Sequence, residues 1–268
     1  MLIDVNTCFG VMPTRRVAYA DVVTRARMVD DPRPADPTAQ EIDWSLDNLR
    51  RILDRHEVTR ALTCSLRGKL YDTVGGNDET FAAARLDERL VPVATLDPCK
   101  DLAWRDEISR SIDRGARLFR FFPGAQGWAI GALPFRHIAE VLAEHGVAVM
   151  LPAGGWGQQT AMAQMLCPLG LTVVAVGATF GVVAESIAVA AEHGRFLCET
   201  SAMCVGGMVE TVVEAAGAGT LVFGSNSPEF SFEAPLGLVT RATISEGERE
   251  RILGLNALEL LLGEEGAP

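Results

Sequence analysis

The chain has 268 residues, more than most single domains contain but a good fit to one α/β barrel, which commonly has ~250 residues. Its composition, 48% hydrophobic and 22% charged, is typical of a globular protein and not of a disordered or fibrous one. Thirty-five acidic and 24 basic residues give a formal charge of −11, which argues against nucleic acid and anionic membranes as partners.

The start of the chain and its cysteines bear on where the protein works. Met1–Asp4 shows no basic and apolar leader pattern, and no apolar run approaches the ~20 residues that cross a bilayer. The six cysteines are scattered singly without a C-x-x-C pair, which favours reduced thiols. We therefore expect a cytoplasmic protein that does not enter the membrane.

Short apolar runs recur along the chain and predict strands. In chain order they are Leu2–Asn6, Arg60–Ser65, Leu90–Leu96, Ala116–Phe122, Val147–Leu151, Thr172–Gly177, Phe196–Ser201 and Thr220–Ser225. Segments with helical periodicity separate them, such as Trp44–Arg55, Pro134–His145 and Val182–His193. Strands that are apolar on both faces are typical of a parallel sheet covered by helices. The pattern predicts a single, eight-stranded parallel (β/α)₈ TIM barrel over residues 1–268.

The segment after the first strand breaks this rhythm. Residues 11–40 contain prolines at positions 13, 32, 34 and 37 and a basic stretch that includes Arg15 and Arg16, which together are too irregular for one helix. We expect a long loop or lid over the C-terminal face of the barrel.

Catalytic residues of such barrels lie where the strands end. These positions hold Asn6 and Cys8; Cys64, Ser65 and Arg67; Asp97 and Cys99; Arg120 and Phe122; Pro152; Ala178 and Thr179; Glu199 and Ser201; and Asn226 and Ser227. No histidine is among them, because three of the four histidines follow helices and the fourth lies inside a helical segment. A histidine at a helix C-terminus is favoured by the helix dipole, so these residues are expected to be structural.

Several motifs together resemble the amidohydrolase-related family of metal-dependent hydrolases and decarboxylases. They are IDVNTCFG at the start, RLVPVATLDP, GVAVMLPAGG, Thr172–Val182, FGSNSP and the closing ERERILGLNALELLLG. The resemblance covers the chain nearly from end to end. It implies a metal site with His-x-His after strand 1, a histidine after each of strands 5 and 6, and an aspartate after strand 8. The matching positions here are Asn6 and Cys8, Pro152, Ala178 and Asn226.

Proline and alanine offer no side-chain donor to a metal, and asparagine lacks the charge of aspartate. The sequence therefore predicts no metal and no other cofactor. Asn6 and Asn226 are expected to face each other across the site and to hydrogen-bond. A replacement soft-metal site built from Cys8, Cys64, Cys99 and Cys204 is the alternative. Cys8 as a nucleophile would need an activating base, so a buried thiol is the simpler interpretation.

The catalytic candidates are Glu199 as base, Arg120 as anion clamp and Asp97 as a second base. A charge on a barrel strand is more tolerable facing the interior mouth than the apolar helix layer. The alternatives are a structural Arg120–Glu199 ion pair and a turn-forming Asp97.

The remaining candidates bind substrate. They are Asn6, Cys8, Asn226, Ser201, and Gly154 and Gly155, whose loop precedes a helix and could cradle an anion. These residues predict a metal-independent hydrolase or lyase acting on a small carbonyl- or carboxylate-bearing molecule, and possible homodimers. The alternative is a catalytically inactive homologue that serves as a binding or partner subunit.

Overall fold

The computed structural model describes residues 1–11 and 42–262. The loop or lid expected at residues 11–40 lies outside the described residues, apart from Val11. The strands are β1 (Ile3–Phe9), β2 (Arg60–Ser65), β3 (Leu90–Pro92), β4 (Ala94–Thr95), β5 (Leu118–Arg120), β6 (Ala148–Pro152), β7 (Val173–Val176), β8 (Phe196–Glu199) and β9 (Leu221–Val222).

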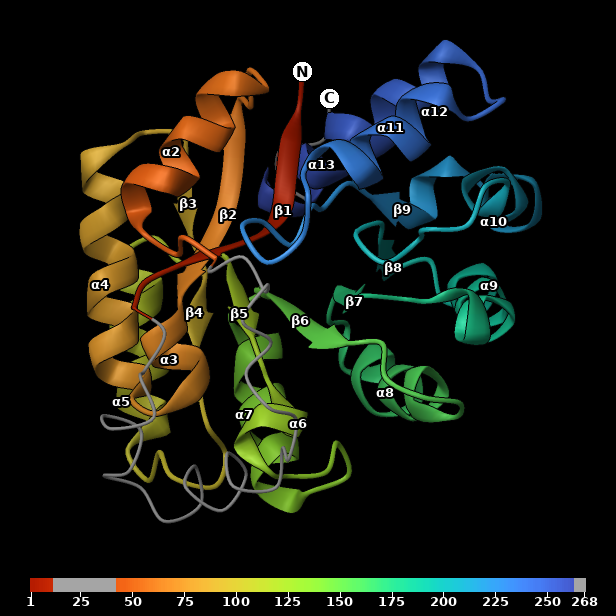
Figure 1. Ribbon diagram of the computed structural model, residues 1–268. Helices are drawn as coiled ribbons and strands as arrows, with labels where there is room; N and C mark the ends of the chain where they lie inside the picture. Colours follow the sequence, from red (N-terminus) through yellow and green to blue (C-terminus); the bar gives the residue numbers. More distant parts are fainter. Residues whose placement is uncertain (12–41, 263–268) are drawn as a thin grey trace, which may run out of the picture.

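Helices follow nearly every strand and lie outside the strands (Figure 1). They are α2 (Leu46–Arg55), α3 (Leu66–Leu70), α4 (Thr73–Leu86), α5 (Trp104–Asp113), α6 (Pro123–Gln126), α7 (Leu133–Glu144), α8 (Gln158–Leu166), α9 (Val183–Glu192), α10 (Met208–Ala216), α11 (Glu233–Arg241), α12 (Glu246–Glu250) and α13 (Asn256–Leu262). A π-helical turn, Arg251–Leu255, joins α12 to α13. Among the described residues, no helix is long and apolar enough to cross a membrane.

The expected parallel α/β barrel architecture is confirmed. All strand pairs are parallel, in the orders β1-β2-β3 and β4-β5-β6-β7-β8-β9. β3 and β4 correspond to the single strand predicted at Leu90–Leu96. The ladder breaks at Val93, after Pro92, which has no N–H to donate. Counted together, β3 and β4 bring the number of strands to eight.

The first strand meets the last at a seam. The backbone N–H of Val5 donates to the carbonyl of Phe223, and that of Cys8 donates to the carbonyl of Ser227, both at 3.0 Å. The register of β1 against β2, on the other edge of the strand, shifts between Asp4 and Thr7.

Two hydrophobic clusters separate the inside of the barrel from its helix layer. Leu118 and Phe122 belong to the inner cluster, whereas Phe119 and Phe121 pack with the helices. Because side chains alternate along a strand, Arg120 points into the barrel. Leu197 is inside and Cys198 outside, so Glu199 also points inward. This placement agrees with the expectation that both charges face the interior.

The histidines lie where the sequence predicts them. His56, His145 and His193 are the residues that end α2, α7 and α9, and His137 lies inside α7. His56 also stacks on Phe232 with the ring centroids 4.3 Å apart, and its Nε2 lies 3.1 Å from Glu233. These contacts support a structural role.

Candidate functional site at the strand ends

Glu199 is a strongly constrained polar side chain at the carboxyl end of the barrel. It is fully buried at the end of β8. One carboxylate oxygen accepts from the backbone N–H of Ser201 at 2.7 Å. The other accepts from the Ser201 hydroxyl at 2.8 Å and from the backbone N–H of Gly177 at 3.1 Å. Burial raises the pKa of Glu199, and these hydrogen bonds and the charge of Arg120 oppose the rise.

The carboxyl group of Glu199 lies directly against Gly224. A Cβ added to residue 224 would overlap the carboxylate oxygen of Glu199 and its two nearest carbons. Glycine at this point of the FGSNSP motif therefore provides the space in which the carboxyl group lies.

Arg120 lies three strands away from Glu199 in the sheet order and is only 8% exposed. Its guanidinium lies 4.9 Å from the centroid of the Phe122 ring. It hydrogen-bonds to Cys64. Among residues 1–11 and 42–262, no ion pair joins Arg120 to Glu199. The expected structural ion pair is therefore not formed there, although the charge of Arg120 still acts on Glu199.

Asn6 and Ser201 extend the polar group around Glu199. The amide nitrogen of Asn6 is 3.5 Å from the Ser201 hydroxyl, and its Oδ1 is buried without a hydrogen-bond partner among the described residues. The structure thus brings Asn6, Ser201 and Glu199 together. An unpaired buried oxygen is available to a donor on a bound ligand.

The prediction of a hydrogen bond between Asn6 and Asn226 is wrong. The amide of Asn226 instead donates to Glu229, at 3.4 Å, and Asn226 has a left-handed backbone with a φ of 55°. Asn226 follows β9, which ends at Val222, and its amide is directed to Glu229.

Cys8 is a buried thiol, in agreement with the simpler interpretation. Its Sγ lies 3.9 Å from the carbonyl oxygen of Ser227. Burial raises the pKa of Cys8 to about 12, so the thiol stays protonated at neutral pH and is a poor nucleophile. Cys64 is buried beside it, but Cys99 and Cys204 are exposed. Within the described ranges no group of three or more His, Cys, Asp and Glu side chains is placed to hold a metal ion, so the alternative four-cysteine site finds no support.

Asp97 has the geometry of a turn. Its carboxylate accepts from the backbone N–H of Cys99 at 2.9 Å and lies 3.8 Å from the amine of Lys100. Its own N–H donates to Asp101 at 2.6 Å. Asp97 also lines a cavity of about 170 Å³ together with Lys69 and Lys100, and Glu199 is not among the residues that line it.

The loop of Gly154 and Gly155 precedes α8, as expected, but an internal carboxylate occupies the helix start. Glu185, from α9, accepts from the backbone N–H groups of Gly157 and Thr160, each at 2.8 Å. The first turn of α8 therefore already carries an anion, which leaves fewer free N–H groups for a ligand.

Sequence reasoning missed Asp4, which is fully buried in β1. Its Oδ1 accepts from the backbone N–H groups of Asn6, at 2.9 Å, and of Ser225, at 3.0 Å. Its Oδ2 accepts from the Ser225 hydroxyl. Burial raises the pKa of Asp4 to about 7. The sequence signal was present, because Asp4, like Glu199, is a carboxylate inside an apolar strand.

Sequence reasoning also missed Lys69, in the short helix α3. Its amine lies 5.5 Å from the centroid of the same Phe122 ring over which Arg120 lies. The signal was present in the composition, because Lys69 and Lys100 are the only lysines of the chain.

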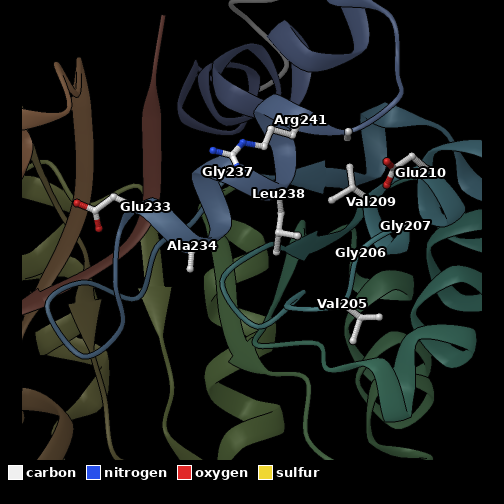
Figure 2. A pocket seen from close by; sticks show the side chains of 11 residues that line it. Val205, Gly206, Gly207, Val209, Glu210, Glu233, Ala234, Gly237, Leu238 and Arg241 are labelled. Carbon is white, nitrogen blue, oxygen red and sulfur yellow. The ribbon is translucent and has the colours of Figure 1, made fainter.

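A separate cavity of about 360 Å³ lies between α10 and α11 (Figure 2). Two of the charged residues that line it already have partners in the protein. Glu210 accepts from the backbone N–H of Thr243 at 2.9 Å, and Glu233 contacts His56. Neither Glu199 nor Arg120 lines it, so this cavity is distinct from the strand-end site.

The strand ends thus carry a buried acid and an inward-facing cation on a parallel α/β barrel. The amidohydrolase family matches residues 76–262, more than half of the chain, and the protein belongs to that family. No curated relative matches the sequence.

Solved structures agree in fold. The 5-carboxyvanillate decarboxylase of Sphingomonas paucimobilis has a TM-score of 0.76 at 14% identity, covering 97% of this chain and 98% of that one. The 5-carboxyvanillate decarboxylase of Novosphingobium aromaticivorans, complexed with manganese and 4-hydroxy-3-methoxy-5-nitrobenzoic acid, has a TM-score of 0.73 at 12% identity, covering 98% and 96%. An uncharacterized TIM-barrel protein of Bordetella bronchiseptica has a TM-score of 0.69 at 19% identity, covering 97% and 98%. At these identities the likeness concerns the fold.

The residues that the structure describes do not fit a metal ion of the kind seen in the manganese complex. At the end of β1 stand an amide, Asn6, and a thiol, Cys8, whose pKa burial raises to about 12. Among the described residues, no group of three or more His, Cys, Asp and Glu side chains accompanies them in a position to hold the ion.

Proposed function

We propose that this protein is a metal-independent hydrolase or lyase that acts on a small carbonyl- or carboxylate-bearing molecule at the carboxyl end of its barrel. Glu199 transfers the proton and Arg120 supplies a positive charge to the substrate. The match to the amidohydrolase family and the fold shared with 5-carboxyvanillate decarboxylases support this proposal.

The observation that carries the proposal is the state of Glu199. A fully buried carboxyl group with a raised pKa holds a proton more readily than a surface glutamate does, as a general acid must. The Ser201 and Gly177 donors fix its two oxygens. A lyase that replaces a carboxylate by hydrogen needs such a proton donor, and a hydrolase needs the same group to move a proton to or from water.

Metal independence is supported by the donor chemistry of the described strand ends, which join an amide and a protonated thiol rather than imidazoles. The cytoplasmic location remains part of the proposal, as does the possibility of a homodimer.

The test is an activity screen against aromatic and aliphatic carboxylic acids and lactones, following carbon dioxide release and acid release separately. We expect turnover that survives dialysis against a chelator and falls at least ~100-fold in Glu199→Gln, the range of a lost general acid–base group. A stoichiometric metal by elemental analysis, with activity lost on chelation and restored by that metal, contradicts the metal-independent mechanism. A wild-type protein inactive on the whole panel that still binds such acids favours the alternative, a non-catalytic binding subunit.

A further inference from the structure

Arg120 is a buried cation that forms no ion pair with a carboxylate among residues 1–11 and 42–262. It is 8% exposed, and among the described residues its hydrogen-bonding acceptor is the thiol of Cys64 rather than a carboxylate. Burying a charge is costly unless it is paired. Glu199, on whose pKa the charge of Arg120 acts, has a pKa raised by burial and so is a poor counter-ion.

Lys69 brings a second positive charge to the same place. Its amine and the guanidinium of Arg120 lie 5.5 and 4.9 Å from the centroid of one ring, that of Phe122. Both charges also act on the thiols of Cys8 and Cys64, where they oppose the rise in thiol pKa that burial causes. Cys8 and Cys64 face each other across the β1–β2 ladder, so both cations act on the β1–β2 side of the mouth.

The carboxylate nearest to Lys69 does not neutralise this pair. Glu229 lies 3.8 Å from the amine, and its side chain is 38% exposed. A long ion pair at that exposure contributes little, and a ligand can displace it. Lys69 is 25% exposed and lines the cavity of about 170 Å³, whereas Arg120 is buried.

We propose that Lys69 and Arg120 form an anion-binding subsite that holds a carboxylate group of the substrate beside Phe122, across the barrel from Glu199. The inference rests on the proposed function, because it assigns the substrate class of the same site. A carboxylate there supplies a counter-charge to Arg120 and accepts hydrogen bonds from both cations. The rest of a small planar acid then extends toward Glu199 on β8.

The test uses benzoate and its neutral analogue benzamide as probes, titrated into the full chain at pH 7 by calorimetry. Wild-type protein is expected to bind benzoate at least ~10-fold more tightly than benzamide. Lys69→Met and Arg120→Met are expected to weaken benzoate binding by about 10- to 100-fold while leaving benzamide binding unchanged. Arg136→Met is the control, since this exposed side chain of α7 pairs with Glu140 in the same helix and is expected to change neither affinity. Circular dichroism verifies that each variant is folded.

Glu199→Gln separates this inference from the proposed function, because it is expected to bind benzoate as the wild type does and yet to lose turnover. If it keeps its turnover, the proposed role of Glu199 fails and the subsite stands. Equal binding of benzoate and benzamide, no binding of benzoate, or unchanged benzoate affinity in Lys69→Met overturns the subsite, whatever Glu199→Gln shows.

Discussion

Ser201 donates twice to Glu199, through its backbone N–H at 2.7 Å and through its hydroxyl at 2.8 Å. The two donors approach different oxygens of the carboxylate, so one residue fixes the plane of the whole group. A hydrogen bond to the charged form of a carboxylate lowers its pKa, which means that Ser201 restrains the rise caused by burial.

Ser201→Ala keeps the backbone donor and removes the hydroxyl. We expect the pKa of Glu199 to move higher, because the charged carboxylate loses a hydrogen bond. The carbonyl stretch of the protonated carboxyl, followed by infrared difference titration and assigned with Glu199→Gln, measures this shift. Ser109→Ala, at a hydroxyl that bonds only within the exposed face of α5, is the control. A titration that stays in place or moves to lower pH refutes the restraint.

Gly224→Ala is expected to displace Glu199, because the new Cβ overlaps its carboxylate. Overpacking of this kind costs about 1–3 kcal/mol of unfolding free energy. Shortening the acid should relieve it, so the double variant with Glu199→Asp is expected to lose less stability than the two single changes added together. Urea unfolding measures all three. Gly194→Ala, which meets open space, is the control with little expected effect. Strict additivity of the two changes would show that the contact is not the cause.

Asp4 predicts a pH dependence of stability. Its pKa rises from 3.8 in the unfolded chain to about 7 in the fold, so between these values the folded protein binds more protons than the unfolded one. Its contribution is therefore complete below about pH 4 and is lost as the pH rises toward 7. The free energy of unfolding of Asp4→Asn, measured in urea over this pH range, is expected to fall less steeply with rising pH than that of the wild type. Identical slopes would show that Asp4 keeps its ordinary pKa.

The cysteines are expected to divide by reactivity. Cys99 and Cys204 are exposed and should react with a thiol reagent in the native protein, whereas Cys8, Cys64 and Cys198 are buried with raised pKa values. Peptide mapping after brief alkylation identifies the modified positions. Rapid native labelling of Cys8 would contradict its burial and reopen its role as a nucleophile.

The fold could be predicted from the sequence because continuous apolar strands and helix-ending residues repeat at barrel spacing. The cost of placing a charge against the apolar helix layer also predicted that Arg120 and Glu199 face inward. The hydrogen-bond partners of the site residues could not be predicted, because they depend on strand register and loop geometry. The left-handed turn at Asn226 directs its amide to Glu229 and away from Asn6. Likewise, Glu185 reaches α8 from the following helix, 28 residues beyond Gly157.

The contact between Asp4 and Ser225 joins positions 221 residues apart. Because a ribosome releases the chain from its N-terminal end, β1 waits as an unmatched edge until β9 has been synthesised. Contacts so distant in sequence form slowly, and an open edge meanwhile invites pairing with another chain. Rapid production of this protein should therefore favour aggregates, and slower translation or a chaperone that covers strand edges should raise the folded yield.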